Sequence, residues 1–267
     1  MTLQQVYNTQ SPVVLITGSG SKRVGQSIAI HFASLGCNIA LHANRSLKEA
    51  ELAAAEIREN YGVQVMVTTG SLEDESTAEK IVGETHVYFG HLDILINSAA
   101  IWSPTALESV TSKEIRRYFD INTLGTFLCA RAAGERMQKQ KTGGSIVNIG
   151  DWATVRPYLD HAAYFPSKGA IEVMTRSLAV ELAHRNNRIR VNCIQPGPVM
   201  LADDASAEYK QEISRSTLTG SVGSPKNVAH AAQFFCENEF VTGVCLPVDG
   251  GRSIYAPDGL QVGRNTG

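Results

Sequence analysis

Two side chains able to exchange a proton stand four residues apart, Tyr164 and Lys168. On a helix this spacing places them on one face, one turn apart. A phenol ordinarily loses its proton near pH ~10. Because a fixed ammonium favours the phenolate, we expect Lys168 to lower the pKa of Tyr164 toward neutrality. A proton donor tuned in this way suits the oxygen or nitrogen beside a carbon that receives hydride.

Asp151 is a third candidate, because the sequence around it predicts that it lies near this pair. The apolar, β-branched run 146–149 predicts a buried strand that ends just before Asp151. A polar loop then leads into a helix predicted over 164–182, in whose first turn Pro166 is tolerated. A Tyr-x-x-x-Lys match arises by chance about once in four sequences of this composition. The alternative is therefore an ordinary pair on a helix surface, and the rest of the chain must distinguish this from a catalytic pair.

The composition limits the class of protein. With 267 residues, 43% of them hydrophobic, the chain can bury one sizeable core. We expect a single domain over 1–267 with tails at 1–11 and 256–267, the second weakly ordered unless it docks on a partner subunit. The net charge of −2 indicates no nucleic-acid or anionic-membrane partner. No apolar run reaches the ~18 residues of a membrane-spanning helix, so we expect no membrane partner. The partner that we expect is a small-molecule substrate.

The cysteines and histidines suggest neither disulfides nor a metal. The five cysteines are far apart and form no CxxC, so we interpret them as reduced thiols of a cytoplasmic protein. The polar N-terminus lacks the cationic start and apolar centre of a signal peptide. The seven histidines show no metal-ligand spacing, and we expect no metal site.

The first apolar run, 13–17, is followed by glycine-rich residues and a helical pattern over 24–35. Strand, glycine turn and helix open a nucleotide-binding βαβ unit, in which backbone N–H groups and the helix N-terminus face a pyrophosphate. Arg23 stands where the GxGxxG pattern has its third glycine, and a plain strand-to-helix turn is the alternative. Lys22 and Arg23 would add positive charge. The candidate cofactor-binding residues of this stretch are Gly18, Gly20, Lys22, Arg23, Val24 and Gly25.

The second predicted strand, 38–43, runs into Asn44, Arg45 and Ser46. A protein specific for NAD usually has Asp or Glu here to hold the ribose 2′-hydroxyl, and this chain offers no carboxylate. A guanidinium and a hydroxyl suit a 2′-phosphate, so the sequence predicts NADP(H) rather than NAD(H). A solvated Arg45, with Ser46 as the N-cap of the next helix, is the alternative, and both roles can coexist.

Further strands and helices alternate along the chain. Helices are predicted over 47–61, 74–89, 113–139 and 226–236, and strands over 63–68, 92–96, 190–194 and 244–248. This rhythm predicts an α/β fold: a single-domain, Rossmann-type, doubly wound parallel sheet of about seven strands with helices on both faces. Such sheets bind ligands at the carboxyl ends of their strands. The irregular segment 200–224 is a candidate substrate lid.

Four further residues are candidates for the site. Ser98 and Ala99 are small enough to let a cofactor approach the backbone closely. Trp102 is either a core or interface residue, or a flat platform over the pocket. Asn122 is unfavourable in the middle of a helix. Its amide would disturb the helix hydrogen bonds and hold a water near Lys168, unless it is an ordinary surface residue.

In their order and spacing these landmarks resemble the short-chain dehydrogenase/reductase family over about residues 12–255. The matching pieces are Thr17-Gly18 with Gly25, Asn97-Ser98-Ala99-Ala100, Asn122, Tyr164-x-x-x-Lys168, Pro196-Gly197 and Asp249-Gly250-Gly251. The resemblance implies a nicotinamide cofactor and usually a homotetramer. It implies Tyr164 as acid and base, Lys168 as the residue that lowers its pKa and binds the nicotinamide ribose, and Asn122 as a water-holding residue. The cofactor site it implies adds Ser71 (in place of the Asp expected near the adenine), Leu72, Asn97, Ser98, Ala99, Tyr164, Lys168, Pro196, Gly197 and Val199.

One position departs from the family. Where the family has a Ser thirteen residues before the Tyr, this chain has Asp151. Pteridine reductases, a branch of the family, are similar in having Asp there, and they resemble this chain at 22–23, at 44–46 and in an aromatic where Trp102 falls. The resemblance implies NADPH-dependent hydride transfer to a pterin-like ring bound by Trp102, Asp151 and Tyr164, with protons supplied through Tyr164 and Asp151. The alternatives are a carbonyl reductase, such as one acting on 3-oxoacyl-acyl-carrier-protein, and a redox-sensing NADP(H)-binding regulator without turnover.

Overall fold

Seven parallel strands form one sheet in the order β3-β2-β1-β4-β5-β6-β7. The computed structural model of this protein describes residues 1–202 and 204–255. The strands β1 and β5 are buried along their whole length, as expected where helices cover both faces of a parallel sheet. The predicted fold class is confirmed. The strands are β1 Val13–Thr17, β2 Asn38–Ala43, β3 Val65–Thr69, β4 Ile94–Asn97, β5 Gly144–Ile149, β6 Ile189–Pro196 and β7 Cys245–Val248.

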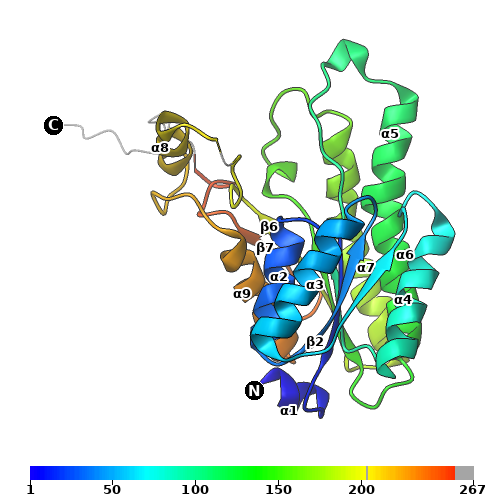
Figure 1. The fold of residues 1–267 in the computed structure, drawn as a ribbon. Coiled ribbons are helices and arrows are strands. Elements are labelled where there is room, and N and C mark those ends of the chain that lie inside the picture. Colours follow the sequence, from blue (N-terminus) through cyan, green and yellow to red (C-terminus); the bar gives the residue numbers. More distant parts are fainter. Residues whose placement is uncertain (203, 256–267) are drawn as a thin grey trace.

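Helices cover both faces of the sheet, because parallel strands need crossover connections (Figure 1). On one face α2, α3 and α9 share a hydrophobic core with Val14 and Ile16 of β1. On the other face α4, α6 and α7 share a core with Val13 and Leu15, as the two-residue period of a strand requires. These helices, with α8 at one side of the molecule, are α2 Val24–Ser34, α3 Leu47–Tyr61, α4 Glu75–Phe89, α6 Gly125–Met137, α7 Tyr164–Arg185, α8 Ala207–Arg215 and α9 Pro225–Glu237.

The strand order reverses around β1, which pairs with β2 on one side and with β4 on the other. The connections after β1 and β4 therefore leave in opposite directions and open a crevice at the carboxyl ends of the strands. Thr17 at the end of β1 lies opposite Asn97 of β4, which lies opposite Asn148 of β5. The glycine turn, the segment after β4 and the segment after β5 thus meet at one edge.

The helix predicted over 113–139 is interrupted. The structure has α5 Ser112–Tyr118, a π-helical segment Phe119–Leu124, and then α6. Asn122 lies in the π-helical segment. Such a segment is rare inside helices and often occurs at functional sites. The prediction of a continuous helix is therefore wrong, and the break falls at the residue whose helix propensity was poor.

Residues 1–11, expected as a tail, contain the short helix α1 Leu3–Tyr7. Its Leu3, Val6 and Tyr7 are buried, and the Tyr7 hydroxyl donates to the carbonyl oxygen of Cys236 in α9 at 3.2 Å. A helix this short is not stable alone, so its contacts with α9 must stabilise it.

Two further expectations concern less regular parts of the chain. The candidate lid 200–224 contains α8, which comes after the cavity-lining Met200. The tail expected at 256–267 lies outside the described residues. Among the helices described, none combines the length and apolar character needed to cross a bilayer.

Candidate active site

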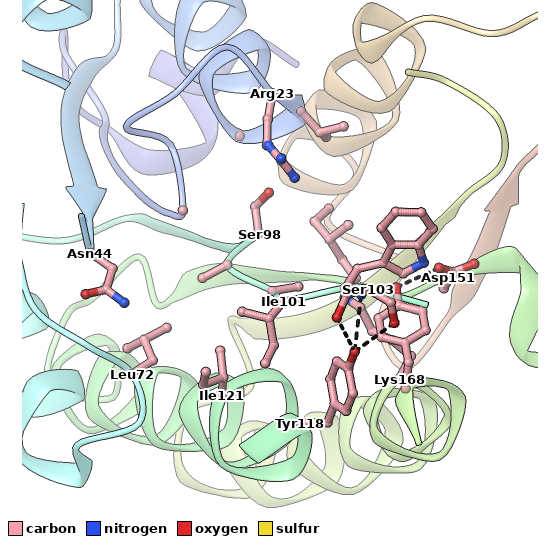
Figure 2. Close-up of a pocket in the computed structure, with 18 of the residues that line it drawn as sticks. Arg23, Asn44, Leu72, Ser98, Ile101, Ser103, Tyr118, Ile121, Asp151 and Lys168 are labelled. Atoms are coloured by element: carbon pink, nitrogen blue, oxygen red, sulfur yellow. Dashed lines mark hydrogen bonds between the residues drawn. The ribbon is translucent and has the colours of Figure 1, made fainter. Parts of the chain in front are cut away.

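A cavity of about 980 Å³ opens at the carboxyl ends of the strands, where the strand order reverses. Its size is at the upper end of the ~300–1,000 Å³ typical of ligand sites. Figure 2 shows Asn44 at one end, Asp151 and Lys168 at the opposite end, and Ser98 between them. The predicted site residues that line it are Gly18, Gly20, Arg23, Val24, Gly25, Asn44, Arg45, Ser46, Leu72, Ser98, Ala99, Trp102, Asp151, Tyr164, Lys168, Pro196 and Gly197.

Five predicted site residues do not line this cavity: Lys22, Ser71, Asn97, Asn122 and Val199. The Lys22 side chain is exposed to solvent, and Ser71 Oγ accepts a hydrogen bond within its own turn. Asn97 is buried, and its amide donates to Asn148 Oδ1 at 3.0 Å. Val199 lines a smaller neighbouring cavity. Their roles at the site stay predictions. The structure places them outside the cavity wall, because side-chain direction and turn geometry cannot be read from order along the chain.

The glycine turn packs backbone against backbone on the segment after β4. Gly18 has a φ of +67°, in the left-handed region, and a Cβ on it would lie 2.6 Å from Ala99 Cα. Thr17 Oγ1 accepts hydrogen bonds from the backbone N–H groups of Ser98 at 3.0 Å and Ala99 at 3.1 Å. A side chain at position 18 would force these segments apart, so glycine is required there.

The imidazole of His42 in β2 forms hydrogen bonds that fix this turn. The sequence did not predict His42 as a site residue. Its Nδ1 accepts from the backbone N–H of Gly18 at 3.3 Å, and its Nε2 donates to the carbonyl oxygen of Gly70 at 3.0 Å. Both bonds require the neutral ring with its proton on Nε2. Burial lowers the pKa of His42 and so favours this neutral form. A histidine in an otherwise apolar strand was the signal available, but its partners are distant in sequence.

The part of the cavity from Asn44 to Ser98 fits the phosphates of a dinucleotide. Arg45, next to Asn44 in the chain, and Arg23 both line the cavity, and Figure 2 shows Arg23 on the side of Ser98. Arg23 stands at the N-cap of α2 without a side-chain cap, which leaves N–H groups of the first turn for a ligand. Ser46 stands at the N-cap of α3 but its hydroxyl makes no capping bond. That hydroxyl lies against the turn, 2.6 Å from where a Cβ on Gly20 would be.

At the other end, the Tyr164 hydroxyl donates to Asp151 Oδ2 at 2.8 Å. Asp151 Oδ1 accepts from the backbone N–H of Ala153 at 2.9 Å, which fixes the carboxylate at the start of the 3₁₀ turn Trp152–Thr154. Asp151 lies just beyond β5 and Tyr164 begins α7, so a strand end and a helix start hold the pair. The structure brings the two residues together, as the sequence led us to expect.

The predicted lowering of the Tyr164 pKa is wrong in this structure. Burial has the largest effect and raises the pKa of the phenol, and the neighbouring Asp151 carboxylate raises it further. The Lys168 ammonium donates to the carbonyl oxygen of Ile149 at 2.8 Å, and burial lowers its pKa although Asp151 opposes this. The phenol therefore keeps its proton at neutral pH and is a proton donor.

Asn122 ties the cavity wall to α7. Its Oδ1 accepts from the N–H of Ile101 at 2.8 Å, and its Nδ2 donates to the carbonyl oxygen of Ile101 and to Ser167 Oγ, each at 3.1 Å. Ser167 Oγ in turn donates to the carbonyl oxygen of Tyr164 at 2.7 Å. The side-chain amide is thus engaged by protein groups, which gives it a structural role, and its expected water-holding role stays a prediction. Ser167 was missed, although it adjoins Lys168.

Trp102 lies at the rim of the cavity with 55% of its surface exposed, which excludes a core role in this chain. Its ring stacks on His161, with centroids 4.9 Å apart and planes inclined by 24°. Nδ1 of the buried His161 donates to the carbonyl oxygen of Leu159 at 2.8 Å, and Tyr158 packs edge-on against the imidazole. The indole of Trp102 therefore has one face stacked on the imidazole of His161, whose orientation is fixed by a hydrogen bond.

Comparisons with known proteins agree with this geometry. A family model described as enoyl-(acyl carrier protein) reductase matches residues 20–253. NADPH-dependent aldehyde reductase 2, chloroplastic, of Arabidopsis thaliana is 30% identical over 256 residues, which cover 90% of this chain and 93% of the relative. A short-chain dehydrogenase/reductase from Serratia marcescens has a TM-score of 0.82 and 27% identity, covering 91% of this chain and 98% of that one. The chain belongs to the short-chain dehydrogenase/reductase family.

A bacterial dehydrogenase is similarly related to this chain. Glucose 1-dehydrogenase 2 of Bacillus subtilis is 31% identical over 249 residues, which cover 90% of this chain and 94% of the relative. This chain is an oxidoreductase of the short-chain dehydrogenase/reductase family. Its phenol and carboxylate stand at the end of the cavity opposite Asn44.

Proposed function

We propose that this short-chain dehydrogenase/reductase is an NADPH-dependent reductase of a pterin-like ring. The observation that carries the proposal is the 2.8 Å hydrogen bond from Tyr164 to Asp151 inside the cavity. An ionised carboxylate accepts hydrogen bonds and donates none. Asp151 therefore favours a substrate that offers N–H groups, as the ring and amino group of a pterin do. A carbonyl oxygen would meet the lone pairs of the carboxylate, which selects against it.

The chain's own residues deliver the proton in this proposal. Burial, and then Asp151, raises the pKa of Tyr164, so the hydroxyl is protonated at neutral pH. When a substrate N–H bonds to Asp151, it competes with the hydroxyl of Tyr164 and frees that hydroxyl to donate to an unsaturated ring nitrogen. Asp151 stays in place because Ala153 holds its other oxygen at 2.9 Å. A positioned acid of this kind contributes about 10²- to 10⁴-fold in rate.

NADP(H) supplies the hydride when it is bound. Arg23, Arg45, Ser46 and the N–H groups at the start of α2 would hold its phosphates, since the three side chains line the cavity and Arg23 stands at the start of α2. The NADPH dependence of the Arabidopsis relative supports the same choice of cofactor. Trp102, backed by His161, would stack on a flat substrate ring.

A carbonyl reductase, including one acting on 3-oxoacyl groups of an acyl-carrier protein, is the second candidate. The description of the family model and the name of the Arabidopsis relative support it. Lys113 and Arg117 also line the cavity, and cations there suit an acidic carrier. A regulator without turnover is a third candidate, and the paired phenol and carboxylate argue against it because binding alone needs no acid.

A substrate panel separates these candidates. NADPH oxidation is monitored with dihydrobiopterin, dihydrofolate, an aldehyde and an acetoacetyl thioester. We expect kcat/KM for the dihydropterins to exceed that for the carbonyl compounds by at least about 10-fold, as a site built for hydrogen bonding discriminates. Turnover of the carbonyl compounds alone would reject the pterin proposal and favour the carbonyl reductase. Tight NADPH binding without turnover of any of them would favour the regulator.

We also propose that the protein is a cytoplasmic homotetramer. The family resemblance supports this assembly, and α7 presents Val173 and Val180 to solvent at 64% and 73% exposure, as apolar side chains that a partner subunit would cover. The absence of any CxxC supports a reducing compartment. Light scattering should give a mass near four chains of 28.8 kDa, and a monomer mass would contradict the assembly. Cell fractionation tests the compartment.

A further inference from the structure

Two cysteines lie side by side on neighbouring strands next to the active site. In the parallel pairing of β6 with β7, Cys193 is directly opposite Cys245. Neighbouring strands are about 4.8 Å apart, and a disulfide needs Cα atoms about 4.4–6.8 Å apart. The backbone therefore already holds these two residues at a separation that a disulfide can span.

The two thiols differ in exposure and in their neighbours, and these differences predict a different role for each. Cys193 is fully buried, whereas Cys245 is partly exposed on the edge strand β7. Arg176 Nη1 lies 3.8 Å from Cys245 Sγ. The hydrogen bond from Cys193 lowers the pKa of the Cys245 thiol and Arg176 acts in the same direction, against burial and Glu172. Cys245 is thus the accessible nucleophile and Cys193 the thiol behind it.

The remaining cysteines are all buried. Cys37, Cys129 and Cys236 are buried, and burial has the largest effect in raising the pKa of each thiol. A buried thiol in apolar surroundings is chemically inert, and burial is the one influence on the Cys129 thiol. Cys129 is therefore the internal control for any reaction at the pair.

We propose that Cys193 and Cys245 are a reversible redox pair that hydroperoxides oxidise to a disulfide. The Cys245 thiolate attacks one oxygen of hydrogen peroxide, so that an S–O bond forms, the O–O bond breaks and the departing hydroxide takes up a proton. The Cys193 thiol then attacks the sulfenic sulfur, so that the S–S bond forms and the S–O bond breaks, and water leaves with the thiol proton. Two thiols lose two electrons, and one peroxide is reduced to two waters.

The pair also contacts the residue that precedes Asp151. A Cβ on Gly150 would lie 2.9 Å from Cys193 Sγ, so this sulfur packs directly on Gly150. The Gly150 N–H donates to the carbonyl oxygen of Ile194 in β6 at 2.8 Å. Formation of the disulfide draws the sulfur toward Cys245 and away from Gly150. Because Asp151 is the next residue, we expect oxidation to lower turnover.

Peptide mapping of the peroxide-treated full-length protein tests the bond itself and needs no activity, so it is independent of the function proposed above. We expect one cross-linked peptide pair joining Cys193 and Cys245, lighter than the reduced pair by two hydrogen atoms and reversed by dithiothreitol. In Cys193→Ser, Cys245 should stop at the sulfenic acid and be trapped by dimedone. No cross-link in the wild type, or equal oxidation of Cys129, would overturn the proposal.

Turnover tests the link to the active site. Oxidised wild type should lose at least about fivefold in kcat, well within the ~10²-fold that a 1 Å misplacement can cost, and dithiothreitol should restore it. Cys245→Ser should match the untreated wild type before and after peroxide. A fully cross-linked protein with unchanged kcat would refute the link, and the same loss in Cys245→Ser would assign the effect to another residue.

Discussion

Tyr164 keeps its proton because burial and the carboxylate 2.8 Å away both disfavour the phenolate. The sequence predicted that Asp151 and Tyr164 would meet, because one ends a strand and the other begins a helix. It did not predict the direction of the pKa shift. That direction depends on where the Lys168 ammonium points, and the ammonium bonds to the carbonyl oxygen of Ile149. Residue spacing gives proximity, whereas electrostatics depends on burial and orientation.

Tyr164→Phe tests the proton donor. We expect kcat to fall at least about 10²-fold, because a positioned acid is lost, while the thermal midpoint stays within a few degrees. Tyr7→Phe is the matched control. It removes a buried hydroxyl bonded to Cys236, and neither residue lines the cavity. The change should cost about 1 kcal/mol of stability without changing kcat. Full activity in Tyr164→Phe would remove this residue from the mechanism.

Arg45→Ala tests recognition of the 2′-phosphate. Arg45 lines the cavity beside Ser46 and Asn44. We expect KM for NADPH to rise at least about 10-fold and KM for NADH to change little, since a charge-assisted hydrogen bond contributes about 1.5–3 kcal/mol. Lys48→Ala, at an exposed cation nearby that does not line the cavity, should leave both constants unchanged. Equal increases for both cofactors in Arg45→Ala would contradict the assignment.

At the scale of elements, the ends of β1, β4 and β5 carry the site, and the helices that pack on the sheet hold these strand ends in place. The apolar runs and glycine turn made these strand ends predictable to within a few residues. The break at Phe119–Leu124 could not be predicted. It depends on Asn122 reaching Ile101 and Ser167, on two separate segments. Local propensity marked Asn122 as unusual but did not identify its partners.

Gly18→Ala, compared with Gly62→Ala, tests the close packing of the glycine turn. Both glycines have a φ of +67°, but a Cβ on Gly18 would lie 2.6 Å from Ala99 Cα, whereas one on Gly62 would meet nothing within 4 Å. We expect Gly62→Ala to cost about 1 kcal/mol for its backbone conformation alone. Gly18→Ala should cost at least about 2 kcal/mol more by chemical denaturation. Equal losses would show that the turn is not tightly packed.

At the scale of the whole molecule, the alternation of strands and helices was enough to predict the sheet, its helix-covered faces and the edge that holds the site. Long-range contacts were not predictable. α1 is stable because Tyr7 reaches Cys236, and the glycine turn is held by His42, which also reaches Gly70. Neither interaction leaves a pattern in the sequence, because the partners come together only in the folded chain.

His42 makes stability depend on pH. Its pKa is lowered in the folded protein by burial, whereas the unfolded chain takes up this proton near pH ~6.5. Below that value the unfolded state binds more protons, so the free energy of unfolding should fall as the pH drops through it. His42→Gln should therefore lose less stability than wild type between about pH 7.5 and about pH 5.5. His230→Gln, at an exposed position, should behave like wild type, and an identical pH dependence in all three proteins would refute the role of His42.

The central claim is that the carboxylate facing Tyr164 selects a substrate rich in N–H groups. The most direct measurement is kcat/KM of wild type and Asp151→Ser for dihydrobiopterin and for an aldehyde, with NADPH saturating. The account predicts that Asp151→Ser loses at least about 10-fold with dihydrobiopterin, because a shorter, neutral hydroxyl replaces the charged acceptor of the ring N–H, and keeps or gains activity with the aldehyde, to which the hydroxyl can donate. A variant that reduces dihydrobiopterin as well as wild type, or that loses both activities equally, would contradict it.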